Sequence, residues 1–370
     1  MTSDPVISEL ARRFELFADV ECRGLSPLYE HLSLHVARTP ALLEIASHSR
    51  KGQAPPNLLL AATHLLLAQE GASTRLAQYY ASLVEAHRPP DAGLGAAFEA
   101  FCLRHRDALV HLVSTRLVQT NEPARSAALR LGLGEVARVL GTGAFALVEV
   151  GASAGLNLNF DAYRIDYGYG RVVGPAAGVP LATDLRPGSL VVPAEAPAVP
   201  VRVGLDLAPI DPTDAESAAW LRALVWPEDR ERLRTLDAAL TAAAAHPPRL
   251  VAGDAVLTLA EVVEGLAAGM PVCIFHSATL AHLPAPRRAE FVIALHRLAE
   301  TREVAWLSME GARLLDQYTP RADAPGVAGG YLLLGLTELR AGQSQSRSLA
   351  AVNPHGRWIE WWDGVIPGPR

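Results

Sequence analysis

The sequence has 370 residues, of which 50% are hydrophobic, and it carries a formal net charge of −6 from 33 basic and 39 acidic residues. This length allows one large domain or two smaller ones with a sizeable core. Because the charges are spread without long runs of one sign, the composition argues against nucleic-acid and membrane-surface partners. The three cysteines lie far apart, which indicates neither a disulfide framework nor a cysteine zinc cluster. We therefore expect a cytoplasmic globular protein that acts on a small molecule, and we assign no metal site.

The first 140 residues are predicted to form an all-helical N-terminal domain. Helix-start signals recur at Asp4-Pro5, Ser26-Pro27 and Thr39-Pro40, where a capping side chain precedes a proline at the first helical position. The apolar residues that follow are spaced by three and four, as in amphipathic helices. The N-terminus lacks the apolar core of a signal peptide, and no apolar run reaches a membrane-spanning length. We expect neither a secretion signal nor a membrane span.

The stretch Ala144–Phe160, AFALVEVGASAGLNLNF, is the centre of the sequence. Its apolar run suits a strand that is buried on both faces, as in a parallel sheet. Gly151 and Gly155 would let the backbone turn sharply, and the N–H groups that open the following helix, near Asn157, would point at a bound group. The pattern predicts a corner that cradles a ligand.

Three known motifs can be compared with this corner. A dinucleotide fingerprint fits poorly, because Ser153 and Leu156 occupy two of its glycine positions. A nucleophile elbow, G-x-S-x-G, fits GASAG in every letter, with Ser153 as nucleophile and His276 or His355 as base. That fold needs several strands before the elbow, however, and the preceding residues are predicted to be helical. The acidic-x-G-x-G-x-G corner of S-adenosylmethionine-dependent methyltransferases matches at Glu149 and at both glycines, with Ser153 in the middle position.

Carboxylates follow the next two predicted strands. A Gly/Pro/Tyr-rich excursion at about residues 161–200 precedes VRVGLDLAPID, which reads as a second strand ending at Asp206. An aspartate in that place can accept the hydroxyl hydrogens of a ribose, and its alternative role is to form a turn. RLVAGDAV predicts a third strand followed by Asp254 and Ala255.

Further polar residues end the strands beyond. PVCIFHS predicts a fourth strand with His276 and Ser277 at its carboxyl end, where ligands of open α/β sheets bind. His276 is either a general base or a structural histidine hydrogen-bonded behind the cofactor. EVAWLSMEG predicts a fifth strand ending near Glu310, and YLLLGLTEL and SLAAVNPHGRWIEWW predict a final antiparallel pair. Asn121-Glu122 forms a polar break before the central strand, where Asn121 points into the site, caps the helix begun at Pro123, or does both.

These residues also carry a family resemblance. The strings LVQTNE, EVGASAGLNLNFDAYRIDYG, GLDLAPIDPTD, WLRALVWPE, FHSATLAHLP and NPHGRW resemble a bacterial domain-of-unknown-function family, the one numbered 2332. The resemblance implies that residues 141–370 form a Rossmann-like domain similar to class I methyltransferases, with a seven-stranded sheet, helices on both faces and a reversed last strand. It also implies the cofactor contacts. The methionine side would meet Glu149, Gly151, Ser153, Gly155 and Asn157; the ribose Asp206; the adenine Asp254 and Ala255; and the fourth-strand position is held by His276 and Ser277.

The expected activity is that of an S-adenosylmethionine-dependent transferase, above all a small-molecule methyltransferase. His276 would be the base, Asn121, Glu122 and Glu310 would contact substrate, and residues 1–140 would cap the cofactor pocket. Three alternatives stay open: other sulfonium chemistry (aminocarboxypropyl transfer or cyclisation), a serine hydrolase that uses Ser153, and a non-catalytic binding protein. Association into a homo-oligomer is also left open.

Overall fold

The computed structural model describes residues 5–119, 121–186, 192–318 and 330–362. Two compact units share the chain: the first contains residues up to Thr120 together with Ala215–Asp237, and the second contains Asn121–Asp214 and the residues from Ala238 onward. The segment Ala215–Asp237, which lies between strands in the sequence, therefore belongs to the unit of the N-terminal helices.

The first unit is a bundle of helices. Four of them begin at a proline. Proline suits the first helical position because it has no N–H, and an N–H there would have no intrahelical acceptor. Ser26 caps the second, since its Oγ accepts the Tyr29 N–H at 3.0 Å. The unit's helices are α1 Pro5–Phe17, η1 Ala18–Cys22, α2 Pro27–Val36, α3 Pro40–Ser47, α4 Pro55–Glu70, η2 Ala77–Tyr79, α5 Leu94–Arg104, α6 Arg106–Thr115, α8 Ala215–Ala223 and the first half of α9 Arg230–Ala245. Within the described residues before Asn121 there is no strand, which confirms the helical prediction.

The second unit is built on a nine-stranded sheet of order β5-β12-β11-β10-β9-β8-β1-β6-β7. The five strands from β9 to β7 in this order are mutually parallel, while β10 runs antiparallel to both β9 and β11. In the central strand, Val148 lies beside Val203 of β6 and Ile274 of β8. The strands are β1 Ala144–Val150, β5 Asp184–Leu185, β6 Ala198–Asp206, β7 Arg249–Ala252, β8 Val272–Ser277, β9 Val304–Gly311, β10 Leu332–Arg340, β11 Gln343–Val352 and β12 Trp358–Trp361.

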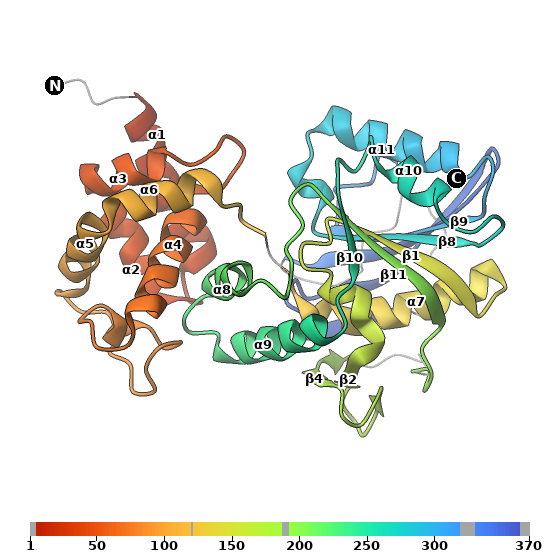
Figure 1. The fold of residues 1–370 in the computed structure, drawn as a ribbon, viewed down its shortest axis with the longest axis horizontal. Helices are drawn as coiled ribbons and strands as arrows, with labels where there is room; N and C mark the ends of the chain where they lie inside the picture. Colours follow the sequence, from red (N-terminus) through yellow and green to blue (C-terminus); the bar gives the residue numbers. More distant parts are fainter. Residues whose placement is uncertain (1–4, 120, 187–191, 319–329, 363–370) are drawn as a thin grey trace. The chain divides into compact units, whose positions relative to one another are not determined.

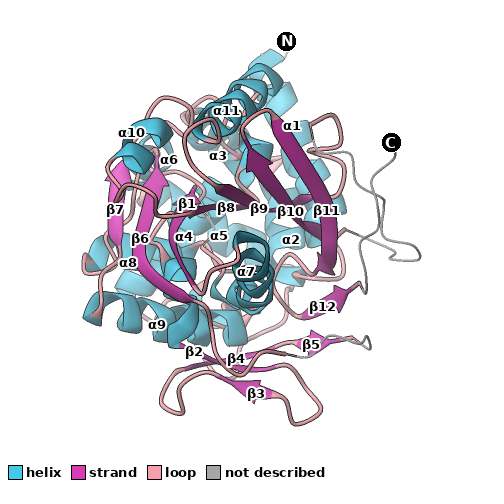
Figure 2. Cartoon of the chain, turned by 90° about the vertical axis from the view of Figure 1, so that its right-hand side faces the viewer, coloured by secondary structure: helices cyan, strands magenta, loops and turns pink. Residues whose placement is uncertain are grey.

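Helices cover both faces of this sheet (Figures 1 and 2). α10 (Leu259–Glu264) and α11 (Ala285–Leu298) cover one face, where Val148 and Val150 share a core with Phe291 and Leu295 of α11. α7 (Ser126–Leu140) covers the other face. Its Gly132 lies so close to the sheet that an added Cβ would come within 3.0 Å of Leu307.

The expected seven-stranded sheet with a reversed last strand is corrected in two respects, the number of strands and the strand that is reversed. The sheet has nine strands, because a turn at residues 353–357 divides the expected seventh strand into β11 and β12, and β5 from the excursion adds an edge. The expected antiparallel pair is confirmed as β10 and β11. The sixth strand in the predicted order, β10, is reversed, and β11 again runs in the direction of β9. The added strands β12 and β5 run in the direction of β10.

The excursion after the corner contains a separate small sheet of order β3-β2-β4. Its strands are β2 Tyr163–Asp166, β3 Val172–Val173 and β4 Val179–Ala182. It lies on the α7 side of the unit, where the Tyr167 hydroxyl donates to the Ala127 carbonyl of α7 at 2.7 Å (Figure 2). Among the described residues, no helix is long and apolar enough to cross a membrane.

Candidate functional site

The carboxyl ends of β1 and β8 mark the point where the order of the sheet reverses. From β1 the chain adds β6 and β7 on one side and then β8 and β9 on the other. Val150, the last residue of β1, lies beside His276 of β8 and Leu205 of β6. Ligands of doubly wound sheets bind at such a switch point, where the loops diverge and leave a crevice. We therefore expect a ligand to bind at this edge of the sheet, beside the loops that follow β1 and β8.

The glycine corner after β1 is closed by the protein's own acceptors. The N–H groups of Gly151 and Ala152 both donate to the Leu205 carbonyl, at 2.8 and 3.3 Å. The Ser153 N–H donates to Asp206 Oδ2 at 2.8 Å, and the Leu156 N–H donates to Asn121 Oδ1 at 3.1 Å. The expected α-helix is replaced by a 3₁₀ helix, η4 (Leu156–Ala162), which is kinked at its fourth residue. The expectation that helix N–H groups point at a ligand is therefore wrong for these positions.

The corner is nevertheless shaped for close approach. Gly151 has φ of 74°, and a Cβ placed on it would collide with the Thr279 side chain, so only glycine fits between the two loops. Ser153 and Ala278 follow the neighbouring strands β1 and β8 with φ of 52° and 51°. Such left-handed conformations are uncommon outside glycine and cluster at functional sites. Both strained residues flank the switch point.

Asn121 fixes the corner from behind. Its Oδ1 accepts the Leu156 N–H, and its Nδ2 donates to the Ala152 carbonyl at 3.4 Å, with the residue only 8% exposed. It does not cap the short helix η3 (Pro123–Arg125), because that cap is Glu122, whose Oε1 accepts the Ala124 N–H at 3.4 Å. Asn121 therefore does not cap the helix and instead holds the glycine corner.

Arg125 connects the loops of three segments. Its Nε donates to the Pro354 carbonyl at 2.8 Å, and its Nη1 donates to Ser277 Oγ at 3.1 Å. The next residue, Ser126, donates to Asn157 Oδ1 at 2.9 Å. No motif in the sequence singled out Arg125, although it lies two residues after the Asn-Glu-Pro string. One guanidinium thus joins the loop after β8 to the loop after β11.

Glu149 is a buried carboxylate with an unfilled acceptor. It is 2% exposed, its Oε1 receives one long hydrogen bond from Asn157 Nδ2 at 3.5 Å, and its Oε2 has no hydrogen-bond partner. Burial raises the pKa of Glu149 to about 8, and Asp206 adds to that rise, while Asn157 and Arg125 oppose it. A carboxylate in such a place is stabilised by any donor or cation that reaches its second oxygen.

His276 is locked in the layer between the sheet and α11. It has no exposed surface, its Nε2 accepts the Trp306 indole N–H at 2.8 Å, and its Nδ1 donates to Glu310 Oε1 at 2.7 Å. An indole N–H can only donate, which assigns the imidazole proton to Nδ1. Both nitrogens are thereby used, so the geometry favours the structural alternative over the general base.

Glu310 holds that arrangement together. Its Oε1 also accepts the N–H groups of Thr279 and Leu280, at 2.8 and 3.0 Å. Burial alone would raise the pKa of Glu310, but the hydrogen bonds from His276 and from these two amides lower it below the ordinary value. Glu310 thus positions the Thr279 loop against Gly151.

A carboxylate and an imidazole that lie far apart in the sequence meet beside Arg125. Glu122 is 2% exposed, and its Oε2 lies 3.3 Å from Nδ1 of His355, whose side chain is 42% exposed. Gly356, with φ of 69°, packs this turn against Ala124. The sequence suggested His355 only as a partner of Ser153, so this pair was missed. The sequence feature that could have indicated this pair was the string NPHGRW, which contains His355.

The two aspartates form turns. Asp206 receives the Ser153 N–H on one oxygen and the Ala208 N–H at 2.9 Å on the other, although a carboxylate has lone pairs for further donors. Asp254 accepts the Val256 N–H at 2.8 Å and pairs with Arg287 of α11. The hydrogen bonds described above do not connect Asp254 or the adjoining Ala255 to the cluster around Arg125.

Ser153 does not have the surroundings of an activated nucleophile. Its Oγ is buried and has no hydrogen-bond partner. A serine nucleophile needs a base within hydrogen-bond reach. The hydrolase alternative therefore lacks its second residue here, despite the strained backbone of Ser153.

The fold and this site define an α/β protein whose buried polar residues gather at the switch point of a large, mostly parallel sheet. The chain belongs to the family described as "Uncharacterized protein conserved in bacteria (DUF2332)", whose model matches residues 11–361. No curated protein matches the sequence significantly. The family resemblance drawn from the sequence is thereby confirmed. Four of the strings that carried it, around Asn121, Ser153, Ser277 and His355, meet in this cluster.

Proposed function

We propose that this protein binds S-adenosylmethionine at the switch point and transfers its methyl group to a small molecule. The observation that carries the proposal is Glu149, a buried carboxylate with one unfilled oxygen and a pKa raised to about 8. The ligand has two cationic groups, an α-ammonium and a sulfonium, and either one would stabilise the ionised form of Glu149.

The order of the strands supports this cofactor class. The order β7-β6-β1-β8-β9 is that of doubly wound nucleotide-binding sheets, which hold the ligand across the reversal point. Asp206 ends the strand beside β1, the place from which an aspartate binds ribose hydroxyls in nucleotide-binding sheets. Ser153, four residues after Glu149 in the chain, offers a buried hydroxyl without a partner. The finer comparison with class I methyltransferases rests on these features, on both faces of the sheet being covered, and on a reversed strand beside β9.

Chemistry at this site would depend mainly on positioning. The sulfonium supplies an already activated methyl group, so the protein must align the acceptor and take up its proton. We assign proton uptake to His355 rather than to His276. His355 is half exposed and is held by the buried Glu122, the arrangement that orients an imidazole for proton transfer. Arg125 ties its turn to Ser277 at the end of β8.

The cofactor assignment is tested by thermal-shift titration with S-adenosylmethionine, S-adenosylhomocysteine and NAD in parallel. A ligand at about 100 times its Kd stabilises the native state by roughly 2.7 kcal/mol, enough for a shift of a few degrees. We expect shifts with the two sulfur compounds only, reduced by Glu149→Gln and retained by Glu300→Gln, which changes an exposed glutamate. If neither sulfur compound shifts the transition, or if Glu149→Gln responds like the wild type, the assignment is wrong.

A further inference from the structure

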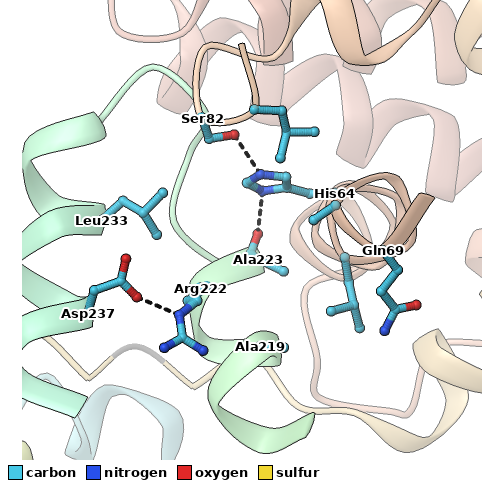
Figure 3. A pocket seen from close by; sticks show the side chains of 11 residues that line it. His64, Gln69, Ser82, Ala219, Arg222, Ala223, Leu233 and Asp237 are labelled. Carbon is cyan, nitrogen blue, oxygen red and sulfur yellow. Dashed lines mark hydrogen bonds and ion pairs between the residues drawn. The ribbon is translucent and has the colours of Figure 1, made fainter. Parts of the chain in front are cut away.

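The first unit contains a cavity of its own, separate from the residues discussed above. Its volume is about 300 Å³, and its lining comes from residues 64–83 and 219–237, all within that unit (Figure 3). α4, the loop after it, α8 and the start of α9 each contribute to the wall. A mainly apolar cavity of this size with a few polar groups at fixed places is the usual form of a small-ligand site.

Most of the wall is apolar. Leu65, Leu83, Leu233 and Ala219 line it together with the ring of His64. His64 is 4% exposed, and burial lowers the pKa of His64 to about 4, so its ring is neutral at physiological pH. Its Nδ1 donates to the Ala223 carbonyl at 3.1 Å, which leaves Nε2 to accept the Ser82 hydroxyl at 2.8 Å (Figure 3). The histidine therefore forms part of the wall and is not an ionic contact.

The ionic groups of the cavity are an arginine and an aspartate on successive helices. Arg222 of α8 donates through Nε to Asp237 Oδ1 of α9, and both side chains are a little under half exposed (Figure 3). This pairing uses one of the five N–H donors of the guanidinium, and a carboxylate can accept several hydrogen bonds. The pair has no net charge, yet it presents a cation and an anion side by side.

We propose that this cavity binds a free α-amino acid with an apolar side chain. Its carboxylate would lie on the terminal nitrogens of Arg222, its ammonium on the carboxylate of Asp237, and its side chain against Leu65, Leu83 and Leu233. A planar guanidinium matches a carboxylate in two parallel hydrogen bonds. The zwitterion suits the neutral pair, whereas an apolar anion would also face Asp237 and an apolar amine would also face Arg222.

Saturation-transfer NMR on the full chain with L-leucine tests the proposal. Two analogues isolate the charges: 4-methylpentanoate lacks only the ammonium, and 3-methylbutylamine lacks only the carboxylate. We expect L-leucine to bind with a Kd below about 1 mM and each analogue to bind at least about tenfold more weakly, the effect of losing a charge-assisted contact. Absence of saturation transfer to L-leucine overturns the proposal, and so does equal binding of either analogue.

Variants locate the ligand. Arg222→Gln and the cavity-filling Ala219→Phe should each weaken L-leucine binding at least about tenfold. Arg234→Gln, which removes an exposed arginine of the same helix as Asp237, should leave it unchanged. If both cavity variants bind L-leucine like the wild type, the ligand lies elsewhere and the proposal fails. Because no residue of the switch point is involved, the thermal shift with S-adenosylhomocysteine should be the same in all three variants, so the two proposals fail independently.

Discussion

Two buried glutamates, at the ends of the parallel strands on either side of β8, have opposite electrostatics. Glu149 of β1 and Glu310 of β9 are each 2% exposed. Glu310 receives hydrogen bonds from an imidazole and two backbone amides and has a lowered pKa, whereas Glu149 receives one long hydrogen bond and has a pKa raised to about 8. Burial alone does not decide the charge of a carboxylate; the donors built around it do. Oε2 of each glutamate is without a hydrogen-bond partner, so the two residues differ in the donors at Oε1 and in the direction of the pKa shift. From that difference we infer that Glu310 is part of the scaffold and that Glu149 binds a ligand.

The largest expected difference is in stability. Glu310→Gln weakens the acceptor of three buried donors and should lower the free energy of unfolding by about 3 kcal/mol. Glu149→Gln removes no comparable set and should not destabilise the protein at pH 7. Urea denaturation of the two variants measures both values, and equal losses would remove the distinction between the two residues.

The exposed imidazole of His355 should contribute to turnover, whereas the buried imidazole of His276 should contribute to folding. His355→Asn is expected to lower methyl transfer to an acceptor found by screening by at least about 100-fold, the usual contribution of a positioned base, without changing the affinity for S-adenosylhomocysteine. Product formation and thermal shift are measured on the same preparation. Unchanged turnover in His355→Asn would show that the Glu122–His355 pair is not the base.

The two glutamates should also give opposite dependences of stability on pH. Glu149 has a folded pKa above its unfolded value, so it binds a proton on folding, and stability falls as pH rises from the ordinary glutamate range to about 8. The advantage of Glu149→Gln over the wild type should therefore grow between pH 5 and 7, by up to about 1.4 kcal/mol per pH unit. The lowered pKa of Glu310 has the opposite effect on stability. Its contribution to stability is present above the unfolded pKa and is lost as the pH falls through the folded pKa. A constant difference between Glu149→Gln and wild type from pH 5 to 7 would show that Glu149 is ionised in the folded protein.

The smallest effect is expected at Ser153. Ser153→Ala removes a buried hydroxyl that has no partner, so stability should change by less than about 1 kcal/mol and binding of S-adenosylhomocysteine should persist. A fluorophosphonate probe should not label the wild-type protein. Labelling that is lost in Ser153→Ala would instead support the hydrolase alternative.

The features that local patterns control could be predicted from the sequence. Prolines at helix starts marked α1, α2 and α3, and apolar runs ending in a polar residue marked β1, β6, β7, β8 and β9. The extra strands escaped prediction because the turn at Asn353–Gly356 interrupts a continuous β pattern, and β5 is a two-residue strand whose partner, β12, is distant in the sequence. The helix after the corner was predicted, but not its 3₁₀ form or its kink at Asn159.

The candidate site was predictable in its members but not in their roles. Nothing near His276 in the sequence indicates that Trp306 and Glu310, on the adjoining strand, occupy both ring nitrogens. Likewise, 233 positions separate Glu122 from His355, and the tertiary fold brings them together. Such pairings depend on tertiary structure, to which local sequence patterns are insensitive.

Calorimetric titration of S-adenosylhomocysteine at pH 7, in two buffers of different ionisation enthalpy, measures the protons exchanged on binding. Glu149 is mostly protonated at that pH in the free protein, because its pKa is about 8. If the α-ammonium of the ligand pairs with it, the carboxylate must ionise, and binding should release roughly one proton in the wild type and none in Glu149→Gln. Binding without proton release in the wild type, or the same release from Glu149→Gln, would show that Glu149 does not receive the ligand.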